Sequence, residues 1–251
     1  MNSSQLLSEI IESQPFPLMF LTISGAHLYG FPSENSDYDL RGVHIAPTQK
    51  LLGLYPIRET IEVAERESEV KIDLVTHEIK KFFTLLLTRN GYVLEQLYSP
   101  LILKTTPEHR QLKAIASNCI TCNHYYHYYG YAKNQWRSFN QTNIYKDKIK
   151  ALLYTYQALL AGIHLLNTGK IEANLVNLNQ DFKLPYIDDL IAIKKVKLET
   201  QNLPKIDLKL YQQEYERLQG ELDVAFENSN LPDNPTAKPE LNSILLKIRT
   251  R

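Results

Sequence analysis

The chain has 251 residues, of which 28 are Lys or Arg and 28 are Asp or Glu, so its formal net charge at pH 7 is zero. A chain of this length can bury a substantial core and fits one large domain or two smaller ones, of which we expect two. Without a global positive charge, the protein is not one whose whole surface attracts nucleic acid or anionic membranes, and such a partner would require a local patch.

Cysteine usage and hydropathy indicate the compartment. Two cysteines, Cys119 and Cys122, are too few for the disulfide framework of a small secreted domain, and the N-terminus lacks the pattern of a signal peptide. The longest apolar stretch, 151–166, is shorter than a bilayer span and contains Gln157 and His164. We therefore expect a cytoplasmic protein without a membrane partner, in which 151–166 is a buried helix.

The first part of the chain mixes helix and strand signals. Ser3 or Ser4 can cap a helix that runs to about Glu12, and prolines then separate it from an apolar run. Apolar runs and period-two alternation between turn residues predict four strands, at 18–23, 39–45, 60–64 and 70–76. A helix at 77–88 is expected to follow.

Beyond Pro100 the sequence predicts helices and no further strand. Thr106 can cap a helix that begins with a proline and an acidic residue, and Gly169 is suited to end another. The expected helices are 107–137, 143–168, 186–199, 206–227 and 238–249. The predicted fold class is therefore α+β, with a small mixed β-sheet domain and flanking helices at 1–104 and an all-helical domain at 105–251.

The stretch 24–42, S-G-A-H-L-Y-G-F-P-S-E-N-S-D-Y-D-L-R-G, combines glycines with closely spaced aspartates. In a strand, Asp37 and Asp39 would project from the same face, where two carboxylates repel each other. A divalent cation removes that repulsion, and hard oxygen ligands favour Mg²⁺, Mn²⁺ or Ca²⁺. Asp73 interrupts an otherwise apolar strand and is the best candidate for a third ligand.

Just before these aspartates, the first strand is expected to end at Ser24 and Gly25 and to open into a helical turn. Such a turn directs free backbone amides at an anion, and glycine permits close approach. Amides beside a carboxylate-bound cation make a site for a metal-bound polyphosphate.

Each of these features also has a structural explanation. Asp-Tyr-Asp between serine and glycine is common turn chemistry, and Asp73 could pair with Arg41 or Arg58. An EF-hand loop is excluded because Arg41 takes a ligand position, Thr48 stands where a glutamate is required and Pro47 blocks the exit helix. The motifs G-x-G-x-x-G and G-K-[ST] do not occur in the sequence. The combination of features favours a binding site over a solvated loop.

The segments G-A-H-L-Y-G and S-D-Y-D-L-R-G-V resemble the signature of the DNA polymerase beta-type nucleotidyltransferase superfamily. They are most similar to its RlaP-like branch of predicted nucleotidyltransferases associated with RNA repair, and G-Y-V-L-E-Q-L-Y-S-P at 91–100 also resembles that branch. The resemblance covers 18–100 well and the helical remainder loosely. It implies that 1–104 is the catalytic nucleotidyltransferase domain.

The resemblance also implies roles for individual residues. Asp37, Asp39 and Asp73 would be catalytic and would hold two Mg²⁺ ions, with Mn²⁺ as an alternative. Residues implied to contact or adjoin the nucleotide phosphates are Ser24, Gly25, Ala26, Ser36 and Arg41. The family usually has serine at position 26, whereas Ala26 keeps the backbone amide but lacks a hydroxyl.

The helical part is expected to close one side of the cleft and to supply cations. Lys146 and Lys150 are four residues apart on one helix face, so either could bind the triphosphate, and we assign Lys150 to the nucleotide site. The alternative is that both are ordinary solvated lysines. Arg41 likewise has two readings, a contact to phosphate oxygens or a pair with Asp73.

Two other clusters could suggest binding sites. Four zinc-type ligands lie within 119–127, but on one helix they would point around more than half the circumference, which favours buried cysteines and partly exposed histidines. These four are Cys119, Cys122, His124 and His127. The aromatic stretch 124–139, with Lys133 and Arg137, could stack on bases of RNA, although tyrosines at helical spacing are also typical of helix packing.

The sequence therefore predicts a Mg²⁺-dependent nucleotidyltransferase that moves a nucleoside monophosphate from an NTP to a hydroxyl acceptor, with RNA among the candidates. Two-metal in-line attack would release pyrophosphate. The alternative is a catalytically weak or inactive nucleotide-binding module of the same fold that serves in regulation or partner binding.

Overall fold

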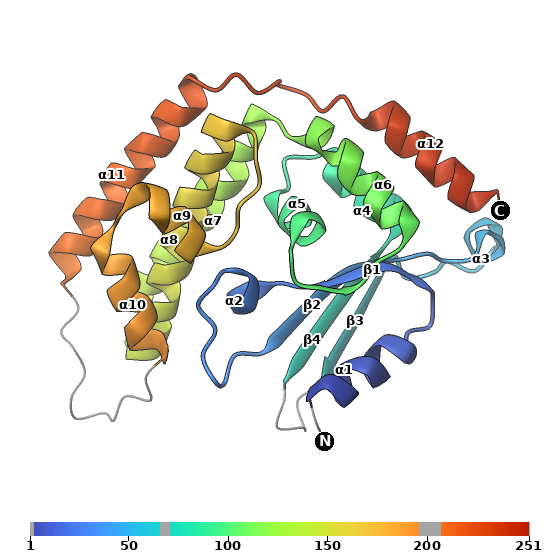
Figure 1. Ribbon diagram of the computed structural model, residues 1–251, viewed down its shortest axis with the longest axis horizontal. Coiled ribbons are helices and arrows are strands. Elements are labelled where there is room, and N and C mark those ends of the chain that lie inside the picture. The colour runs from blue at the N-terminus through green and yellow to red at the C-terminus, as the bar shows by residue number, and fades with distance from the viewer. Residues whose placement is uncertain (1–2, 66–70, 196–206, 251) are drawn as a thin grey trace.

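The computed structural model describes residues 3–65, 71–195 and 207–250, and Figure 1 shows a five-stranded sheet beside a bundle of helices. The described strands are β1 (Leu18–Ile23), β2 (Tyr38–His44), β3 (Thr60–Glu65), β4 (Ile72–Glu78) and β5 (Ile102–Lys104). Their order in the sheet is β3-β4-β2-β1-β5. β2 and β4 are parallel and the other neighbours antiparallel, so the sheet is mixed, as predicted.

Helices flank the sheet and make up most of the remaining described chain. In the sheet part of the chain, which we define as 3–104, they are α1 (Ser3–Glu12), α2 (Gly25–Leu28), α3 (Thr48–Leu52), α4 (Ile79–Leu86) and α5 (Gly91–Tyr98). In the helical part, 107–250, they are α6 (Pro107–Ile115), α7 (Tyr125–Gln141), α8 (Tyr145–Thr168), α9 (Leu175–Phe182), α10 (Pro185–Lys195), α11 (Leu208–Glu227) and α12 (Lys238–Arg249). The predicted α+β fold class is confirmed.

The single helix predicted at 107–137 is wrong, because the chain breaks between α6 and α7. Ile120 and Thr121 have extended backbones, and one short 3-10 turn lies on each side of them. The amide of Cys122 donates to the carbonyl oxygen of Pro232 (3.1 Å), so a contact with a distant loop replaces a helical hydrogen bond. Helical periodicity alone gave no sign of this break.

Further differences concern short elements. No strand was predicted beyond Pro100, yet β5 pairs with β1 at the sheet edge; its three residues are too few for a period-two pattern.

Three short helices, α3, α5 and α9, were also missed. α5 is capped by Asn90, whose side chain accepts from the amide of Tyr92, and α9 by Asn174, whose side chain accepts from the amides of Val176 and Asn177. The helix predicted at 186–199 corresponds to α10, and 196–199 lies outside the described residues, as do 70 and 206.

Two hydrophobic clusters hold these elements together. A small one lies between α1 and the sheet and includes Ile10, Leu21 and Leu40. The larger one is continuous from β1 to α12. Although α6 and α12 lie beyond the predicted division at 104/105, α6 packs on β1 and α12 on α4 (Figure 1). That division stays a prediction.

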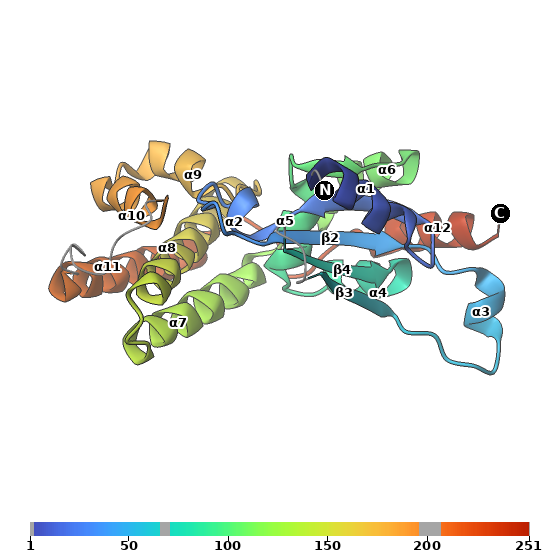
Figure 2. The same cartoon turned by 90° about the horizontal axis from the view of Figure 1, so that it is seen from below.

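α8 is the central helix of the helical part, and nearly all of its residues from Ala151 to Leu166 are buried. By length and composition it could cross a membrane, but 83% of its most apolar window is buried inside the protein. Gly169 ends it in the left-handed conformation (φ 69°), as its sequence position suggested. α8 packs most extensively on α7, which runs beside it (Figure 2), and this contact anchors the helical part.

The close packing of α7 against α8 depends on Gly162. A Cβ at this position would lie 2.8 Å from the Tyr128 Cβ and 2.9 Å from the Leu222 Cδ1. We expect Gly162→Ala to lower the free energy of unfolding by about 1–3 kcal/mol through overpacking. Chemical denaturation would measure the change.

Gly130 provides the matched control, because it lies within α7 and a Cβ there would meet no atom within 4 Å. Gly130→Ala should raise the free energy of unfolding by about 0.5–1 kcal/mol through helix propensity. Equal effects of the two substitutions would contradict the packing described for α7 and α8.

Candidate active site

The strand register brings the predicted carboxylates to one region of the sheet. In the parallel pair of β2 and β4, Asp39 lies directly opposite Asp73. Asp37 immediately precedes β2 and is exposed, whereas Asp39 is half-buried. The spacing of residues along the two strands therefore places Asp39 and Asp73 side by side without any help from the loops.

Arg41 joins these two aspartates. Its Nη2 donates to the Asp39 Oδ1 (3.0 Å) and the Asp73 Oδ2 (2.9 Å). Its Nη1 donates to the backbone oxygens of Leu40 (3.0 Å) and Asp73 (2.6 Å). Of the two roles considered for Arg41, the structure displays the pairing with Asp73 and adds a second pairing, with Asp39.

The surroundings of Asp39 shift the pKa of its carboxyl in opposite directions. Burial raises the pKa of its carboxyl above the usual value; Arg41 opposes that shift, while the charges of Asp73 and Asp37 add to it. In the described parts of the chain, no three His, Cys, Asp or Glu side chains gather closely enough to hold a metal ion. The charges of the three predicted ligands therefore influence one another, but in this structure the three carboxylates do not surround one point.

The turn that follows β1 packs directly against Asp39. The amide of Ser24 donates to the Asp39 carbonyl oxygen (2.8 Å), and Gly25 opens α2 with φ of +59°. A Cβ at position 25 would lie only 1.9 Å from the Asp39 Oδ2. Gly25 is therefore required here for two reasons, the left-handed backbone and the close approach of a carboxylate.

Ser36 shapes the loop that leads into β2. Its Oγ accepts from the amide of Ser33 (2.9 Å) and lies 3.2 Å from the Ser33 Oγ, while its own amide donates to the Ser33 carbonyl oxygen (2.9 Å). These contacts close a tight turn just before Asp37. Ser36 nevertheless lines the cavity described next, as do Ala26 and Asp37.

A cavity of about 680 Å³ separates this acidic region from the helices α7, α8 and α10. We call its two sides the acidic wall, which includes Asp37 and Asp39, and the lysine wall, which includes Lys146, Lys150, Lys194 and Lys195. Two more carboxylates line the cavity, Glu34 and, between Lys146 and Lys150 in the sequence, Asp147. Tyr131, Gln135 and Tyr154 are among the other lining residues, and Asp73 does not line the cavity in the described part of the chain. The predicted Lys150 thus shares a cavity with two of the predicted aspartates.

Lys194 is the cation that sequence reasoning missed. Its ammonium lies 4.4 Å from the centroid of the Phe31 ring and 5.9 Å from that of Tyr154. Burial, with a smaller contribution from the charge of Lys150, lowers the pKa of Lys194 to about 8. A half-buried cation that faces another cation is suited to an anionic ligand.

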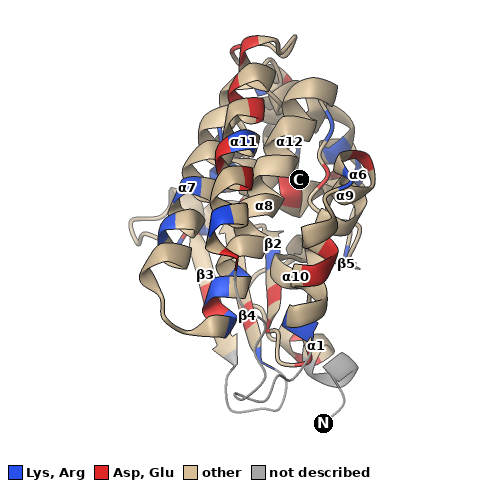
Figure 3. Cartoon of the chain, turned by 90° about the vertical axis from the view of Figure 1, so that its left-hand side faces the viewer, with Lys and Arg blue, Asp and Glu red and all other residues tan. Residues whose placement is uncertain are grey.

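The remaining charged residues of this side of the molecule are of both signs. On the side drawn in Figure 3, Lys and Arg are interspersed with Asp and Glu along the helices. This agrees with the zero formal net charge of the chain. The grouping of Asp37 and Asp39 opposite four lysines is therefore a local feature of the cavity.

The Cys and His cluster is split between the two 3-10 turns and α7. Cys119 and Cys122 are buried and unpaired with each other, and burial raises the pKa of Cys119 to about 11. The Cys122 Sγ donates to the Asp233 Oδ1 (3.3 Å), and the His124 Nδ1 accepts from the amide of Thr121 (3.2 Å). His127 packs against the Tyr92 ring, with centroids 4.6 Å apart. The expected partial exposure is wrong for His124, which is buried.

The aromatic stretch 124–139 mainly packs helices together. Tyr125 stacks on Phe226 with ring centroids 4.5 Å apart, and Trp136 stacks on Tyr215 at 4.3 Å. Tyr131 is the aromatic residue of this stretch that lines the cavity in the described chain. Contact of the stretch with RNA stays a prediction.

With this geometry in view, comparison with known proteins defines the class. The sequence model of the RNA repair pathway DNA polymerase beta family, RlaP, matches residues 2–247, and the chain belongs to this family. The resemblance seen in the motifs is confirmed. It extends over the helical part, which the motifs themselves covered only loosely.

Two relatives of the chain are both described as uncharacterized proteins. The chain is 31% identical over 232 residues to the uncharacterized protein MJ0002 of Methanocaldococcus jannaschii, covering 91% of this chain and 92% of that protein. It is 25% identical over 201 residues to the uncharacterized protein YcgL of Bacillus subtilis, covering 78% and 72%. A crystal structure of a nucleotidyltransferase-like protein from Exiguobacterium sibiricum aligns with 99% of this chain and 79% of that one, at 13% identity and a TM-score of 0.35.

The role of Arg41 as the counterion of Asp39 can be tested without any ligand. Arg41→Gln removes the positive charge that opposes the upward shift, so we expect the pKa of the Asp39 carboxyl to rise further. Carbon-detected NMR titration of the side-chain carboxyls would measure it. Arg217→Gln is the control, because Arg217 pairs with Glu214 and Glu221 and should leave Asp39 unaffected. An unchanged or lower Asp39 pKa in Arg41→Gln would refute the pairing.

Proposed function

We propose that the protein is a Mg²⁺-dependent nucleotidyltransferase that transfers a nucleoside monophosphate from an NTP to a hydroxyl acceptor. The observation that carries the proposal is the cavity with Asp37 and Asp39 on one wall and four lysines on the other. A metal-bound triphosphate is complementary to these walls. Its cation can bind the carboxylates, and its anionic oxygens can bind the ammonium groups. Membership of the polymerase beta family supports the same reaction class.

The acidic wall fits a divalent cation. The charges of Asp37 and Asp73 both oppose ionisation of Asp39, and one guanidinium serves both Asp39 and Asp73. We propose that Asp37 and Asp39 hold Mg²⁺, or Mn²⁺ in its place, and that Asp73, which is paired with Arg41 in this structure, joins them when the ion is bound. When bound, such an ion lowers the pKa of the attacking hydroxyl and neutralises charge on the triphosphate and the leaving pyrophosphate.

The lysine wall would hold the phosphates. Lys150 and Lys194 lie close enough for the charge of one to lower the pKa of the other, and both ammonium groups lie 5.9 Å from the centroid of the Tyr154 ring. Phosphate oxygens between them would relieve this repulsion. The amides that open α2 at Gly25 and Ala26 would contact phosphate from the other side, because the first amides of a helix have no intrahelical partner.

The acceptor and the compartment are part of the proposal. The printed description of the family refers to RNA repair, which supports an RNA hydroxyl as the acceptor. Two free cysteines suit a reducing compartment, which supports the cytoplasm. Charge separation confined to the cavity suits a short RNA end better than a long RNA duplex.

A second function has a specific observation in its favour. Arg41 already neutralises Asp39 and Asp73, and Ala26 offers no hydroxyl for a phosphate contact. Both features suit a module that binds nucleotide weakly and does not turn it over. Metal-dependent NTP binding without pyrophosphate release would identify that module.

The test of the main proposal is transfer of label from each α-labelled NTP, with Mg²⁺ or Mn²⁺, to a panel of RNA ends. We expect transfer by the wild type and its loss in Asp37→Asn and in Asp39→Asn, which keep the fold while removing the charge. Asp223→Asn is the matched control, because the Asp223 carboxylate accepts from the Tyr125 hydroxyl in the helical part. Full activity in either site variant would refute the assignment of the acidic wall.

Nucleotide affinity should also depend on pH through Lys194. Its ammonium is charged below its pKa of about 8 and neutral above it, so affinity should fall as pH rises through about 8. Lys194→Met should weaken binding by about tenfold or more at pH 7 and abolish this dependence, as expected for loss of a charge-assisted contact. Isothermal titration with an NTP analogue between pH 6.5 and 9 would measure both effects.

The matched control for Lys194 is Lys133→Met. Lys133 lies 5.9 Å from the centroid of the Tyr129 ring, a similar cation and aromatic pair outside the cavity. This variant should bind as the wild type does and keep its pH dependence. A Lys194→Met variant that retains the wild-type affinity at pH 7 would exclude Lys194 from the phosphate site.

A further inference from the structure

A buried carboxylate lies behind the cavity, where none of the functions discussed so far uses it. Glu95 lies on α5 and is 3% exposed. It is not one of the cavity-lining residues found in the described chain. Burial raises its pKa to about 7, and its hydrogen bonds oppose that shift. Because a buried carboxylate is costly, its contacts indicate what holds it there.

Glu95 interacts with three separate elements. The Tyr29 hydroxyl donates to its Oε2 (2.9 Å), and the Tyr128 hydroxyl donates to its Oε1 (3.2 Å). The side chain of Gln157, whose Nε2 donates to the Ala173 carbonyl oxygen (3.2 Å), also acts to lower the pKa of Glu95. Tyr29 follows α2 in the sheet part, whereas Tyr128 belongs to α7 and Gln157 to α8. One carboxylate therefore links the turn of the acidic wall to the two helices that pack most extensively together.

Tyr29 connects Glu95 to a residue that lines the cavity. It directly follows the turn that begins at Gly25, and its carbonyl oxygen accepts from the amide of Leu175 at the start of α9 (2.9 Å). Its ring meets the edge of the Tyr154 ring, with centroids 5.6 Å apart, and Tyr154 lines the cavity. Tyr29 is thus held at its backbone by α9 and at its hydroxyl by Glu95.

The neighbouring residue leaves little freedom for adjustment. A Cβ at Gly30 would lie 2.4 Å from the Asn174 Oδ1, so the chain after α2 lies tightly against the start of α9. If the Glu95 contact is lost, Tyr29 keeps its backbone contact with α9 and its ring contact with Tyr154, but it loses the hydrogen bond that ties its hydroxyl to α5. The position of α2 relative to α7 and α8 would then be less well defined.

We propose that Glu95 is a positioning residue that fixes the α2 turn relative to the lysine wall and so sets the separation of the two walls of the cavity. The proposal rests on the proposed function for its consequence, since a metal-bound triphosphate must reach both walls. The positioning itself is a property of the fold alone. It assigns no catalytic step to Glu95, which lies behind the reacting groups.

Glu95→Gln is the sharpest variant, because it preserves size and removes one acceptor. An amide can accept one tyrosine hydroxyl through its oxygen, but its NH₂ group cannot accept the other. Tyr29→Phe is the second variant, which removes a single donor from the same contact. It keeps the proposal testable if Glu95→Gln does not fold.

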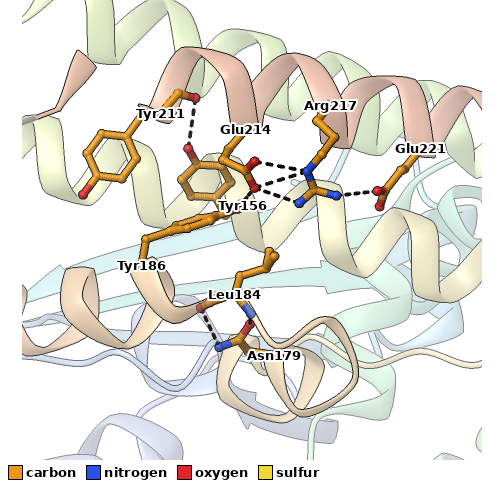
Figure 4. Close-up of polar contacts among 8 residues, drawn as sticks. All are labelled: Tyr156, Asn179, Leu184, Tyr186, Tyr211, Glu214, Arg217 and Glu221. Atoms are coloured by element: carbon orange, nitrogen blue, oxygen red, sulfur yellow. Dashed lines mark hydrogen bonds and ion pairs between the residues drawn. The ribbon is translucent and has the colours of Figure 1, made fainter. Parts of the chain in front are cut away.

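Glu214→Gln provides a matched control within the helical part. Figure 4 shows Glu214 of α11 accepting from the Tyr186 hydroxyl of α10 (2.9 Å), beside Arg217. It is also a tyrosine and carboxylate contact between elements, but it does not include α2. Both carboxylate variants should lower the melting temperature, so loss of stability alone does not distinguish them.

The experiment measures hydrogen exchange in residues 25–30 and the affinity for inorganic tripolyphosphate and for a magnesium-bound, non-hydrolysable NTP. We expect Glu95→Gln and Tyr29→Phe to speed exchange in 25–30 and to weaken binding of the magnesium-bound nucleotide by about tenfold or more, as for a misplaced binding group. Tripolyphosphate without Mg²⁺ makes no metal contact with the acidic wall, so it should lose clearly less affinity than the magnesium-bound nucleotide. Glu214→Gln should leave all three readouts at their wild-type values.

Unchanged exchange in 25–30 in the Glu95 and Tyr29 variants would overturn the proposal. The proposal would also be refuted if Glu214→Gln weakened nucleotide binding as much as the Glu95 and Tyr29 variants do. If the wild type bound no nucleotide, the proposed function would fail, whereas the exchange comparison would still decide whether Glu95 positions α2. The two failures are therefore distinguishable.

Discussion

The parallel pairing of β2 with β4 is the constraint on which the site depends. It places Asp39 opposite Asp73, and the Arg41 guanidinium then reaches both carboxylates from the same strand. β1 pairs with the other edge of β2, so the turn at Gly25 arrives against Asp39. A one-residue slip of β2 would turn every one of these side chains to the opposite face.

The helical part turns this acidic region into a cavity. Its long central helix α8 supplies Lys150, and α10 supplies Lys194, so the cationic wall comes from segments well separated from the aspartates in sequence. The two walls rest on one continuous hydrophobic core, and among the described residues no salt bridge joins Asp37 or Asp39 to the four lysines. A preorganised pair of walls needs little rearrangement when a ligand of matching polarity binds.

The sequence predicted the local parts of the site and, among residues distant from them in sequence, named Asp73 and Lys150. The spacing of Asp37 and Asp39 and the strand pattern before them follow from short-range rules, so both aspartates were expected at the strand start. Lys194 was missed because it lies in a helix, α10, whose place over the cavity is decided by tertiary packing. The two pairings of Arg41 depend on strand register. The break in 107–137 likewise results from a contact with a distant loop.

The central claim is that a metal-bound nucleotide spans the two walls of the cavity. The most direct test is diffraction from crystals grown with Mn²⁺ and a non-hydrolysable NTP, recorded near the manganese absorption edge. The account predicts an anomalous peak beside Asp37 and Asp39, with the phosphates extending toward Lys150 and Lys194. An ordered nucleotide outside the cavity, or one inside it with manganese away from both aspartates, would contradict it.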